Sequence, residues 1–330
     1  MEDGGRTVKG GRLPRSGLPS SDNRQPSSIP VMYDVIIVGA GPAGLSAALM
    51  LGRSRRRVLV CDSGTPRNAA AQALHGYLTR DGMAPREFLR IARAELKEYD
   101  CVELRDVEVT AAECSTDSRF HVTLATGEDY RSRKLLIATG VVDMLPDIPG
   151  FQELFGSSVF HCPYCDGWEV RDQPLAIYGR GTRGSGLALE LTAWSRDLVL
   201  CTDGPPEIDE DGLARLARNA IRVRDDRITR LEGRNGILEH VVFDSGDPLP
   251  RRALFFTTGQ TQRSQLAIAL GCEFNDKGTV RTGKYETTHL RGLYVAGDAS
   301  RAVQWVVVAA AEGAEAAFAI NTDLLKEDLR

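Results

Sequence analysis

The chain has 330 residues, of which 42% are hydrophobic and 26% charged, enough for two ordinary domains and unlike a disulfide-stapled mini-protein. Lys and Arg number 41 against 45 Asp and Glu, and the formal net charge of -4 is too small to indicate a nucleic-acid or acidic-membrane partner. No apolar run reaches the roughly 18 residues needed to span a bilayer, so we expect a soluble, cytoplasmic protein.

The first part of the chain differs in composition from the rest. Residues 1–30 are rich in Gly, Ser, Pro and Arg and hold no apolar core, so we expect them to form a disordered extension. A β-branched run then predicts a strand over Tyr33–Val38, an alanine-rich segment predicts a helix over Leu45–Leu51, and a second strand follows at Arg57–Cys61. Such a β-α-β unit requires parallel pairing of its strands.

A second unit of the same kind follows later in the chain. It comprises the strand Leu175–Tyr178, a glycine-rich turn over 179–184, the helix Leu187–Ser195 and the strand Asp197–Cys201. The chain therefore contains a degenerate internal repeat. Two such units are most simply explained as two nucleotide-binding halves.

Further strands are predicted at Leu135–Gly140, Leu254–Gly259 and Gly292–Ala296, and the last leads into a helix of about Val303–Ile320. We expect this tail to fold back onto the N-terminal domain, which makes the middle of the chain an insertion. The predicted fold is α/β, with two Rossmann-like domains, the second inserted into the first. The expected boundaries are 31–143 and 265–330 for the first domain and 144–264 for the inserted one.

The turn after the first strand matches the GxGxxG pattern of dinucleotide-binding proteins. Its first glycine allows the turn, the second lets the backbone approach a pyrophosphate, the third lets the helix pack closely, and the helix N-terminus supplies partial positive charge. An acid at the end of the next strand can accept a ribose 2′-hydroxyl. The predicted contacts are Gly39, Gly41, Pro42, Ala43, Gly44 and Asp62.

The turn of the second unit, with Gly179, Gly181 and Gly184, repeats the GxGxxG pattern. Arg180 adds bulk to this turn and could reach a phosphate, whereas Asp203 after the next strand favours NADH over NADPH. Two interpretations stay open: a working nicotinamide site, or an inherited fold that has lost its ligand.

Cys162 and Cys165 are the only two of the seven cysteines that lie near each other in sequence. In a cysteine-poor chain a CxxC pair is usually redox-active or bound to a metal. His161 adjoins the pair, but no second CxxC or HxxxH completes a tetrahedral zinc site, so we predict a redox pair and no metal. Asp166 is expected to exchange protons with the thiols if burial raises its pKa, and its structural interpretation, a helix cap, is compatible with that role.

Together these motifs resemble the low-molecular-weight thioredoxin reductases and their relatives, FAD-dependent disulfide oxidoreductases that include gliotoxin and holomycin dithiol oxidases. The resemblance covers about residues 32–325. Its markers are GAGPAG at 39–44, ATG at 138–140, CPYCDG at 162–167 and GLYVAGD at 292–298.

The resemblance implies that FAD binds the first and last segments, with Asp298 at the ribityl chain and Cys165 beside the isoalloxazine. Cys162 would then exchange with the substrate disulfide, and Asp166 would act as acid and base. The other cofactor contacts expected on this basis are Ser63, Asn68, His75, Val109, Gly140, Gly297, Gln304, Trp305 and Val306.

Two departures from the family pattern bear on the electron donor. The basic cluster that usually holds NADPH is replaced by Thr202, Asp203 and Gly204, and the flavin-side Arg-Gln-Ala is replaced by Gln304-Trp305-Val306. Trp305 is expected either to stack beside the isoalloxazine and restrict nicotinamide access, or to pack at a domain interface. His75 is expected to bind the flavin ring or relay protons, or to have a structural role in a loop.

Several functional interpretations follow from the resemblance. The chain could reduce a thioredoxin-like protein or small disulfide with NADH or NADPH, or take electrons from a ferredoxin-type donor without a pyridine nucleotide. It could also run in reverse and oxidise a small dithiol with oxygen as acceptor. A flavin-bearing redox sensor is the non-enzymatic alternative, and a homodimer is expected from the family.

Overall fold

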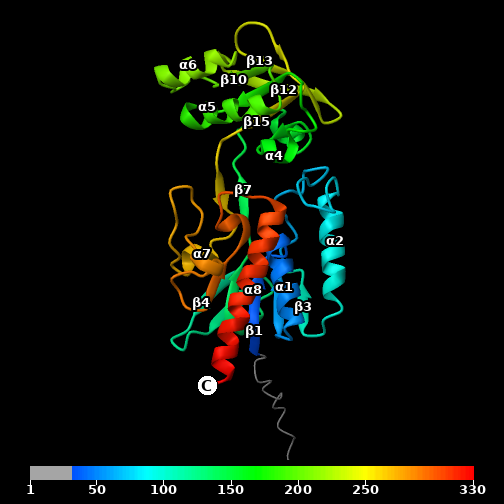
Figure 1. Cartoon of the computed structure of the whole chain (residues 1–330), viewed down its shortest axis with the longest axis vertical. Coiled ribbons are helices and arrows are strands. Elements are labelled where there is room, and N and C mark those ends of the chain that lie inside the picture. Colours follow the sequence, from blue (N-terminus) through cyan, green and yellow to red (C-terminus); the bar gives the residue numbers. More distant parts are fainter. Residues whose placement is uncertain (1–31) are drawn as a thin grey trace, which may run out of the picture. The chain divides into compact units, whose positions relative to one another are not determined.

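The computed structural model describes Met32–Arg330, so the predicted extension over residues 1–30 lies outside the described residues. Two mainly parallel sheets dominate this part of the chain (Figure 1), and one smaller antiparallel sheet and one strand pair complete the strand arrangement. The α-helices are α1 (Pro42–Arg53), α2 (Pro85–Leu96), α3 (Phe151–Leu154), α4 (Pro163–Asp166), α5 (Gly181–Glu190), α6 (Glu210–Arg218), α7 (Leu266–Ala269) and α8 (Val306–Asp328).

The first sheet has seven strands in the order β3-β2-β1-β6-β5-β4, and β17 pairs with β6. The β1, β2, β3, β6 and β17 pairings are parallel, whereas β4, β5 and the first half of β6 pair antiparallel. Strands β2 and β17 are fully buried apolar runs and most of β1 is buried, as expected when helices cover a sheet, whereas β3 at the sheet edge is only partly buried. The strands are β1 (Met32–Val38), β2 (Val58–Cys61), β3 (Val102–Arg105), β4 (Val109–Cys114), β5 (Phe120–Leu124), β6 (Asp129–Ile137) and β17 (Leu293–Val295).

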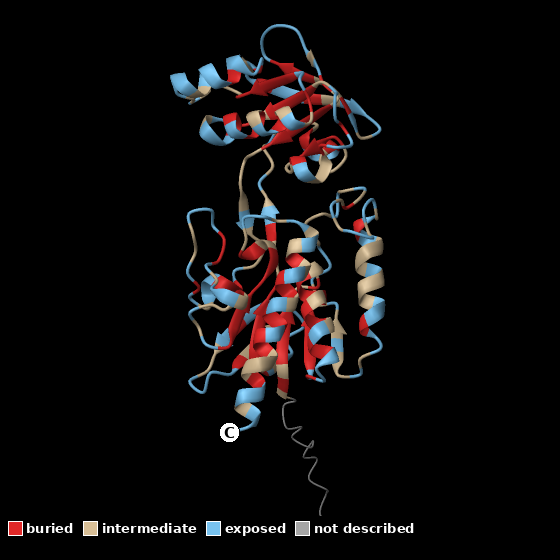
Figure 2. Ribbon diagram, viewed as in Figure 1, coloured by how far each residue is buried: buried red, intermediate tan, exposed pale blue. Residues whose placement is uncertain are grey.

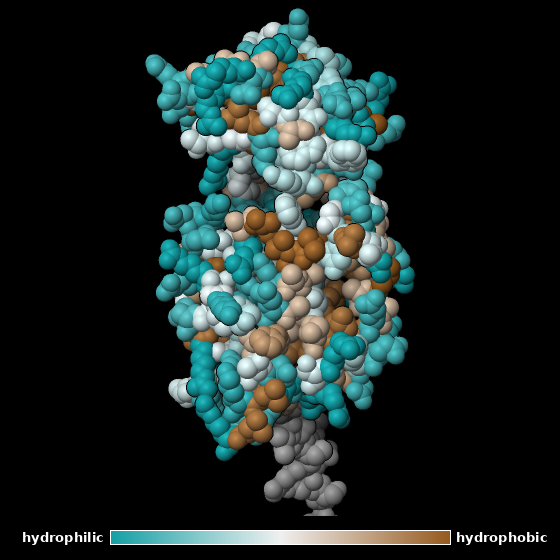
Figure 3. Space-filling view, in the orientation of Figure 1, coloured by the Kyte–Doolittle hydropathy of each residue, from teal (hydrophilic) through white to brown (hydrophobic). Residues whose placement is uncertain are grey.

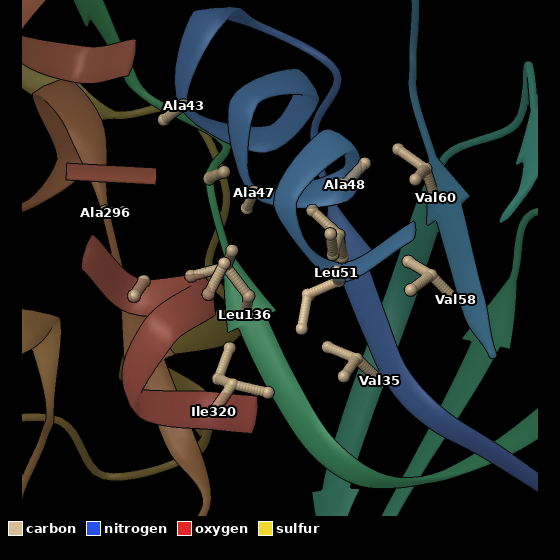
Figure 4. Packing of buried hydrophobic residues seen from close by; sticks show 14 of the residues in the cluster. Val35, Ala43, Ala47, Ala48, Leu51, Val58, Val60, Leu136, Ala296 and Ile320 are labelled. Atoms are coloured by element: carbon tan, nitrogen blue, oxygen red, sulfur yellow. The ribbon is translucent and has the colours of Figure 1, made fainter. Parts of the chain in front are cut away.

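Helices α1 and α8 pack against each other and against this sheet. In Figure 4 Ala47, Leu51 and Leu136 converge between α1 and strand β6, and Ile320 of α8 joins them. The helices approach closely because Gly313 faces α1: a Cβ there would lie 1.9 Å from the Ala43 oxygen. In Figure 2 the strands are buried, while the outer faces of the helices are exposed.

The second sheet is wholly parallel, in the order β11-β10-β9-β15-β8, with α5 connecting β9 to β10. A three-stranded antiparallel sheet, β12-β13-β14, adds Phe243 and Leu231 to the same apolar core. The strands are β8 (Val159–Phe160), β9 (Leu175–Tyr178), β10 (Leu198–Cys201), β11 (Arg222–Arg224), β12 (Ile228–Arg234), β13 (Ile237–Phe243), β14 (Leu249–Pro250) and β15 (Ala253–Phe256).

Strands β7 (Val141–Asp143) and β16 (Gln260–Gln262) form a separate antiparallel pair. The chain runs through β7 from the first sheet toward β8 of the second, and through β16 on its return toward α7 and β17. The second sheet is therefore inserted into the first, and the predicted fold class is confirmed. None of the described helices is long and apolar enough to cross a membrane.

The predicted strands are present, but several helix limits were wrong. The first helix begins at Pro42, next to the glycine turn, and α5 begins at Gly181 and ends at Glu190 with a 3-10 turn behind it. The last helix covers Val306–Asp328, because Trp305 is extended (φ -103°, ψ 149°) and delays its start.

Candidate functional site

A large cavity opens at the carboxyl ends of the first sheet's parallel strands. Its walls combine the turn after β1, the loop after β2, the Thr139-Gly140 segment after β6 and the turn between β17 and α8. Cys165 and Asp166, from α4, which lies in the chain between β8 and β9 of the second sheet, line the same cavity. Ligands of doubly wound sheets bind at this edge, where the strand order reverses.

The first glycine turn presents an open backbone surface to the cavity. Gly39 has a φ of +104°, and a Cβ there would lie 2.4 Å from the Ala138 oxygen, so only glycine fits. A Cβ at Gly41, by contrast, would meet no atom within 4 Å, and no side chain caps the N-terminus of α1. This free helix end can receive a phosphate group.

Polar groups around the turn also suit a dinucleotide. Thr139 lines the cavity, and its hydroxyl is buried with no hydrogen-bond partner within the described chain, as expected of a group that a ligand satisfies. Asp62 accepts a hydrogen bond from the Ala40 amide (3.2 Å) and pairs with Arg93, which fixes its carboxylate at the cavity wall.

Cys162 and Cys165 are joined as a disulfide with their Cα atoms 5.3 Å apart. Cys162 is the residue before α4, and Pro163 begins this one-turn helix, whose amides at Cys165 and Asp166 bond back to the Cys162 oxygen. The turn gives the two sulfur atoms different surroundings, because Cys165 lines the cavity and Cys162 does not.

Asp166 ends α4 and does not cap the start of a helix, so the capping interpretation is wrong. Burial raises the pKa of Asp166 to about 7, the Glu169 carboxylate also raises it, and His75 lowers it. The His75 ring lies between Asp81 (3.5 Å) and Glu169 (3.6 Å) and lines the cavity. An acid with a pKa near neutrality can donate and accept protons under ordinary conditions.

Aromatic side chains pack against Tyr164, which lies between the two cysteines. Tyr164 is 59% exposed and lies between Trp194 and Trp305, with ring centroids 5.3 Å from each. Trp305 also lines the cavity, so it both faces the candidate cofactor site and packs against the CxxC segment. Figure 3 shows apolar side chains gathered around the start of α8, where Val303 and Val307 are also exposed.

The second glycine turn is filled by the chain itself. The Gly181 amide, which the motif would direct at a phosphate, donates to the Pro206 oxygen at 2.9 Å. The Arg180 guanidinium donates to the backbone oxygens of Thr202 (2.6 Å) and Asp203. Asp203 itself accepts from the Ile228 amide at 2.7 Å, so its carboxylate holds the loop.

The remaining thiols are poor nucleophiles. Cys61, Cys201 and Cys272 are buried, and burial raises the pKa of Cys61 and Cys201 to about 12. Cys101 and Cys114 are half-buried, and burial also raises their pKa values. Across Met32–Arg330, no group of three or more His, Cys, Asp or Glu side chains is arranged to hold a metal ion.

The cavity brings together most of the residues predicted from the sequence. Gly44 instead packs on Gly39, and the second turn belongs to the other sheet. The predicted residues at the cavity are Gly39, Gly41, Pro42, Ala43, Asp62, Ser63, Asn68, His75, Val109, Gly140, Cys165, Asp166, Gly297, Asp298, Gln304, Trp305 and Val306.

Sequence reasoning missed Arg67, Thr139, His161 and Arg263, which also line the cavity. Thr139 belongs to the ATG marker, and its position there was an available signal. His161 precedes Cys162, and burial together with the Arg67 cation lowers its pKa. Its ring centroid lies 6.4 Å from those of Phe155 and Phe256, so His161 is an aromatic wall residue, and it belongs to no group of three or more potential metal ligands among the described residues.

Comparison with known proteins gives a consistent result. Residues 33–313 match the family model described as pyridine nucleotide-disulphide oxidoreductase. A probable thioredoxin reductase of Arthroderma benhamiae is 41% identical over 184 residues, which are 54% of this chain and 46% of that protein. Thioredoxin reductase tcpT of Claviceps purpurea is 32% identical over 90% of this chain and 95% of its own length. The crystal structure of HlmI, 38% identical, aligns with a TM-score of 0.86 over 90% of this chain and 94% of that one.

Proposed function

Because the chain belongs to the pyridine nucleotide-disulphide oxidoreductase family, an enzyme family of thioredoxin reductase-like flavoproteins, we propose that it moves electron pairs between FAD and the Cys162–Cys165 disulfide. The disulfide then exchanges with a thioredoxin-like protein or a small disulfide or dithiol. One observation carries this proposal: Cys165 and Asp166 line the cavity that also holds the open glycine turn.

The cavity residues fit the cofactor that the family implies. The free start of α1 and the Gly41 backbone would hold the pyrophosphate of FAD, Asp62 a ribose, and Asp298 the ribityl chain. Thr139 offers a buried hydroxyl that lacks a partner in the described chain. When bound, FAD supplies the capacity to accept or donate an electron pair next to Cys165.

Exchange at the CxxC turn follows from the different surroundings of its two sulfur atoms. A substrate thiolate attacks the Cys162 sulfur, a mixed disulfide forms and the bond to Cys165 breaks. Cys165 then leaves as a thiolate inside the cavity, where Asp166 protonates it. The second substrate thiol resolves the mixed disulfide, so the substrate loses two electrons and two protons and the enzyme pair gains them; the reverse sequence reduces a disulfide.

A spectroscopic titration tests the proposal. The purified chain is loaded with FAD and titrated anaerobically with a dithiol, and the expected result is bleaching of the oxidised flavin band. A Cys162→Ser/Cys165→Ser variant that keeps its FAD is the matched control and should not bleach. Equal bleaching of the two proteins would contradict electron transfer through this disulfide, and a chain that binds no FAD would contradict the cofactor assignment.

A second candidate differs in the electron donor or acceptor. Because Gly181 and Arg180 are bonded to the chain's own carbonyl oxygens, the second glycine turn favours an enzyme that does not use NADH or NADPH. A ferredoxin-type protein would then donate electrons, or oxygen would accept them in a dithiol oxidase.

Titration with pyridine nucleotides separates these candidates. If a dithiol bleaches the flavin but NADPH and NADH leave its spectrum unchanged, the nucleotide-independent candidate is supported. Bleaching by either nucleotide within a catalytic turnover time contradicts it and identifies the donor.

Three further properties belong to the proposal. We place the domain boundaries at 143/144 and 264/265, expect a homodimer, and expect a cytoplasmic protein. Sedimentation velocity of the FAD-loaded chain tests the dimer, and limited proteolysis near the two boundaries tests the division into domains.

A further inference from the structure

Arg67 is a buried cation that the proposed chemistry does not use. It lies in the loop between β2 and α2, and its side chain is only 13% exposed. The guanidinium donates to both oxygens of Asp143 (2.9 and 2.5 Å), to Asp298 (2.8 Å) and to the side-chain oxygen of Gln304 (2.6 Å). A longer bond reaches the Gln260 side-chain oxygen (3.4 Å).

These partners belong to two different parts of the fold. Asp143 ends β7 and Gln260 begins β16, and the two residues face each other in the strand pair that connects the sheets. Asp298 and Gln304 belong to the segment between β17 and α8, which lines the cavity together with Trp305. Arg67 therefore joins the cavity wall to the connection through which the CxxC segment is attached.

The geometry is specific to arginine. A planar guanidinium can bind one carboxylate with two parallel hydrogen bonds and still reach a second carboxylate and an amide oxygen, whereas the ammonium of lysine cannot. Asp143 is also well buried, with 7% of its side chain exposed, and the Arg67 cation lowers its pKa against the effect of burial. A buried pair of this kind resists separation because either partner would be left as an unpaired charge.

We infer that Arg67 is a positioning residue that couples occupancy of the cavity to the geometry of the β7/β16 connection. Filling the cavity fixes Asp298 and Gln304, and through Arg67 it fixes Asp143 and Gln260. The connection in turn holds Cys165 and Asp166 at the cavity. The inference rests on the proposed function for the identity of the ligand, FAD.

Hydrogen exchange of the full-length chain, measured with and without saturating FAD, tests the coupling. The reporters are amides of the β7/β16 connection such as that of Met144, the residue after β7, which donates to the oxygen of Gly259, the residue before β16, at 3.0 Å. Asp143→Asn removes the ion pair at the connection without changing a cavity-lining residue. Arg56→Lys is the control, because Arg56 is similarly buried and bonded to Asn321 and Asp328, and none of these three residues lines the cavity.

We expect FAD to slow hydrogen exchange at these amides at least tenfold in the wild type and in Arg56→Lys. In Asp143→Asn and Arg67→Lys we expect FAD to slow it less than threefold. Undiminished protection in a folded, FAD-loaded Asp143→Asn variant would overturn the coupling. If the wild type binds no FAD, the proposed function fails. The inference is then tested without ligand: the Met144 amide must exchange its hydrogen at least tenfold faster in Asp143→Asn than in the wild type.

A kinetic measurement separates positioning from simple stability. Asp143→Asn is expected to slow flavin bleaching by a dithiol at least tenfold, while the rate of mixed-disulfide formation at Cys162 changes less than twofold. Equal slowing of both steps, or of neither, contradicts a positioning role.

Discussion

Asp166 offers the sharpest test of the chemistry at the disulfide. Burial is the largest cause that raises its pKa from 3.8 to about 7. The shift of about 3 pH units corresponds to roughly 4 kcal/mol between the two protonation states in the folded protein. Near neutral pH the group is therefore half protonated, which allows it to protonate the leaving thiolate of Cys165.

The expected pH dependence follows from this pKa. The protonated fraction of Asp166 falls from about 90% at pH 6 to about 10% at pH 8, so disulfide opening by a given concentration of thiolate falls about fivefold between pH 7 and pH 8 and about tenfold per unit above that. Asp166→Asn keeps the shape of the side chain and removes the proton. We expect a loss of about 100-fold or more, and the descending limb near pH 7 should vanish.

Two neighbouring groups give predictions of opposite sign. His75 lowers the pKa of Asp166 and Glu169 raises it, so His75→Gln should move the limb to higher pH and Glu169→Gln to lower pH. The assay is anaerobic stopped flow from pH 5.5 to 9 with one dithiol, each rate divided by the thiolate concentration. The assignment of Asp166 as the acid is refuted if the descending limb of the pH profile is still present in Asp166→Asn. It is also refuted if the limb moves in the same direction in His75→Gln and Glu169→Gln.

Three other predictions concern the CxxC pair, a buried carboxyl group of α8 and the contact between α8 and α1. Cys165→Ser should trap a stable mixed disulfide with the substrate at Cys162, detected by mass spectrometry; a trap formed only in Cys162→Ser would reverse the two roles. Burial raises the pKa of Glu312 from 4.5 to about 7, so its contribution to stability is greatest below about pH 4.5 and is lost as the pH rises through 7. Between those pH values the wild type should lose about 3 kcal/mol of unfolding free energy that Glu312→Gln does not lose, as measured by urea unfolding. An unchanged pH dependence in the variant would contradict this. Gly313→Ala places a Cβ 1.9 Å from a backbone oxygen of α1 and should destabilise the fold by about 2 kcal/mol or more. The control is Gly186→Ala in α5, whose Cβ meets no atom within 4 Å and which should stabilise the fold by about 0.5–1 kcal/mol. Equal effects of the two substitutions would show that the α1–α8 contact relaxes freely.

The sheets were predictable because their signals are local. Buried parallel strands are short apolar runs, and each one that precedes a nucleotide-type turn is closed by a glycine, as at Gly39 and Gly179. The end of α8 was not predictable in this way. Its last turns are polar, and they are held by ion pairs to β6, where Lys134 contacts Glu327 at 2.6 Å and Arg133 contacts Asp328 at 2.7 Å. Such long-range pairs leave no periodic pattern in the helix.

Cavity residues that belong to a sequence motif could be predicted, whereas a cavity residue that stands outside any motif could not. Asp298 and Cys165 belong to recognisable runs of sequence. Arg67 lies in a loop without periodicity, and its partners are 76, 193, 231 and 237 residues away. The role of Arg67 depends on segments that only the tertiary fold brings together, so no local sequence pattern could predict this role.

The two glycine turns show why a motif predicts backbone shape better than it predicts a ligand. Both have a strand before and a helix behind, and in both the third glycine packs on the first. Their contents differ because of the segment after the next strand. After β2 the chain leaves Gly41 facing open space, whereas after β10 it turns back so that the Pro206 oxygen accepts the Gly181 amide. The ligand capacity of a GxGxxG turn is therefore decided some 25 residues downstream of its second glycine, in a loop that carries no motif of its own.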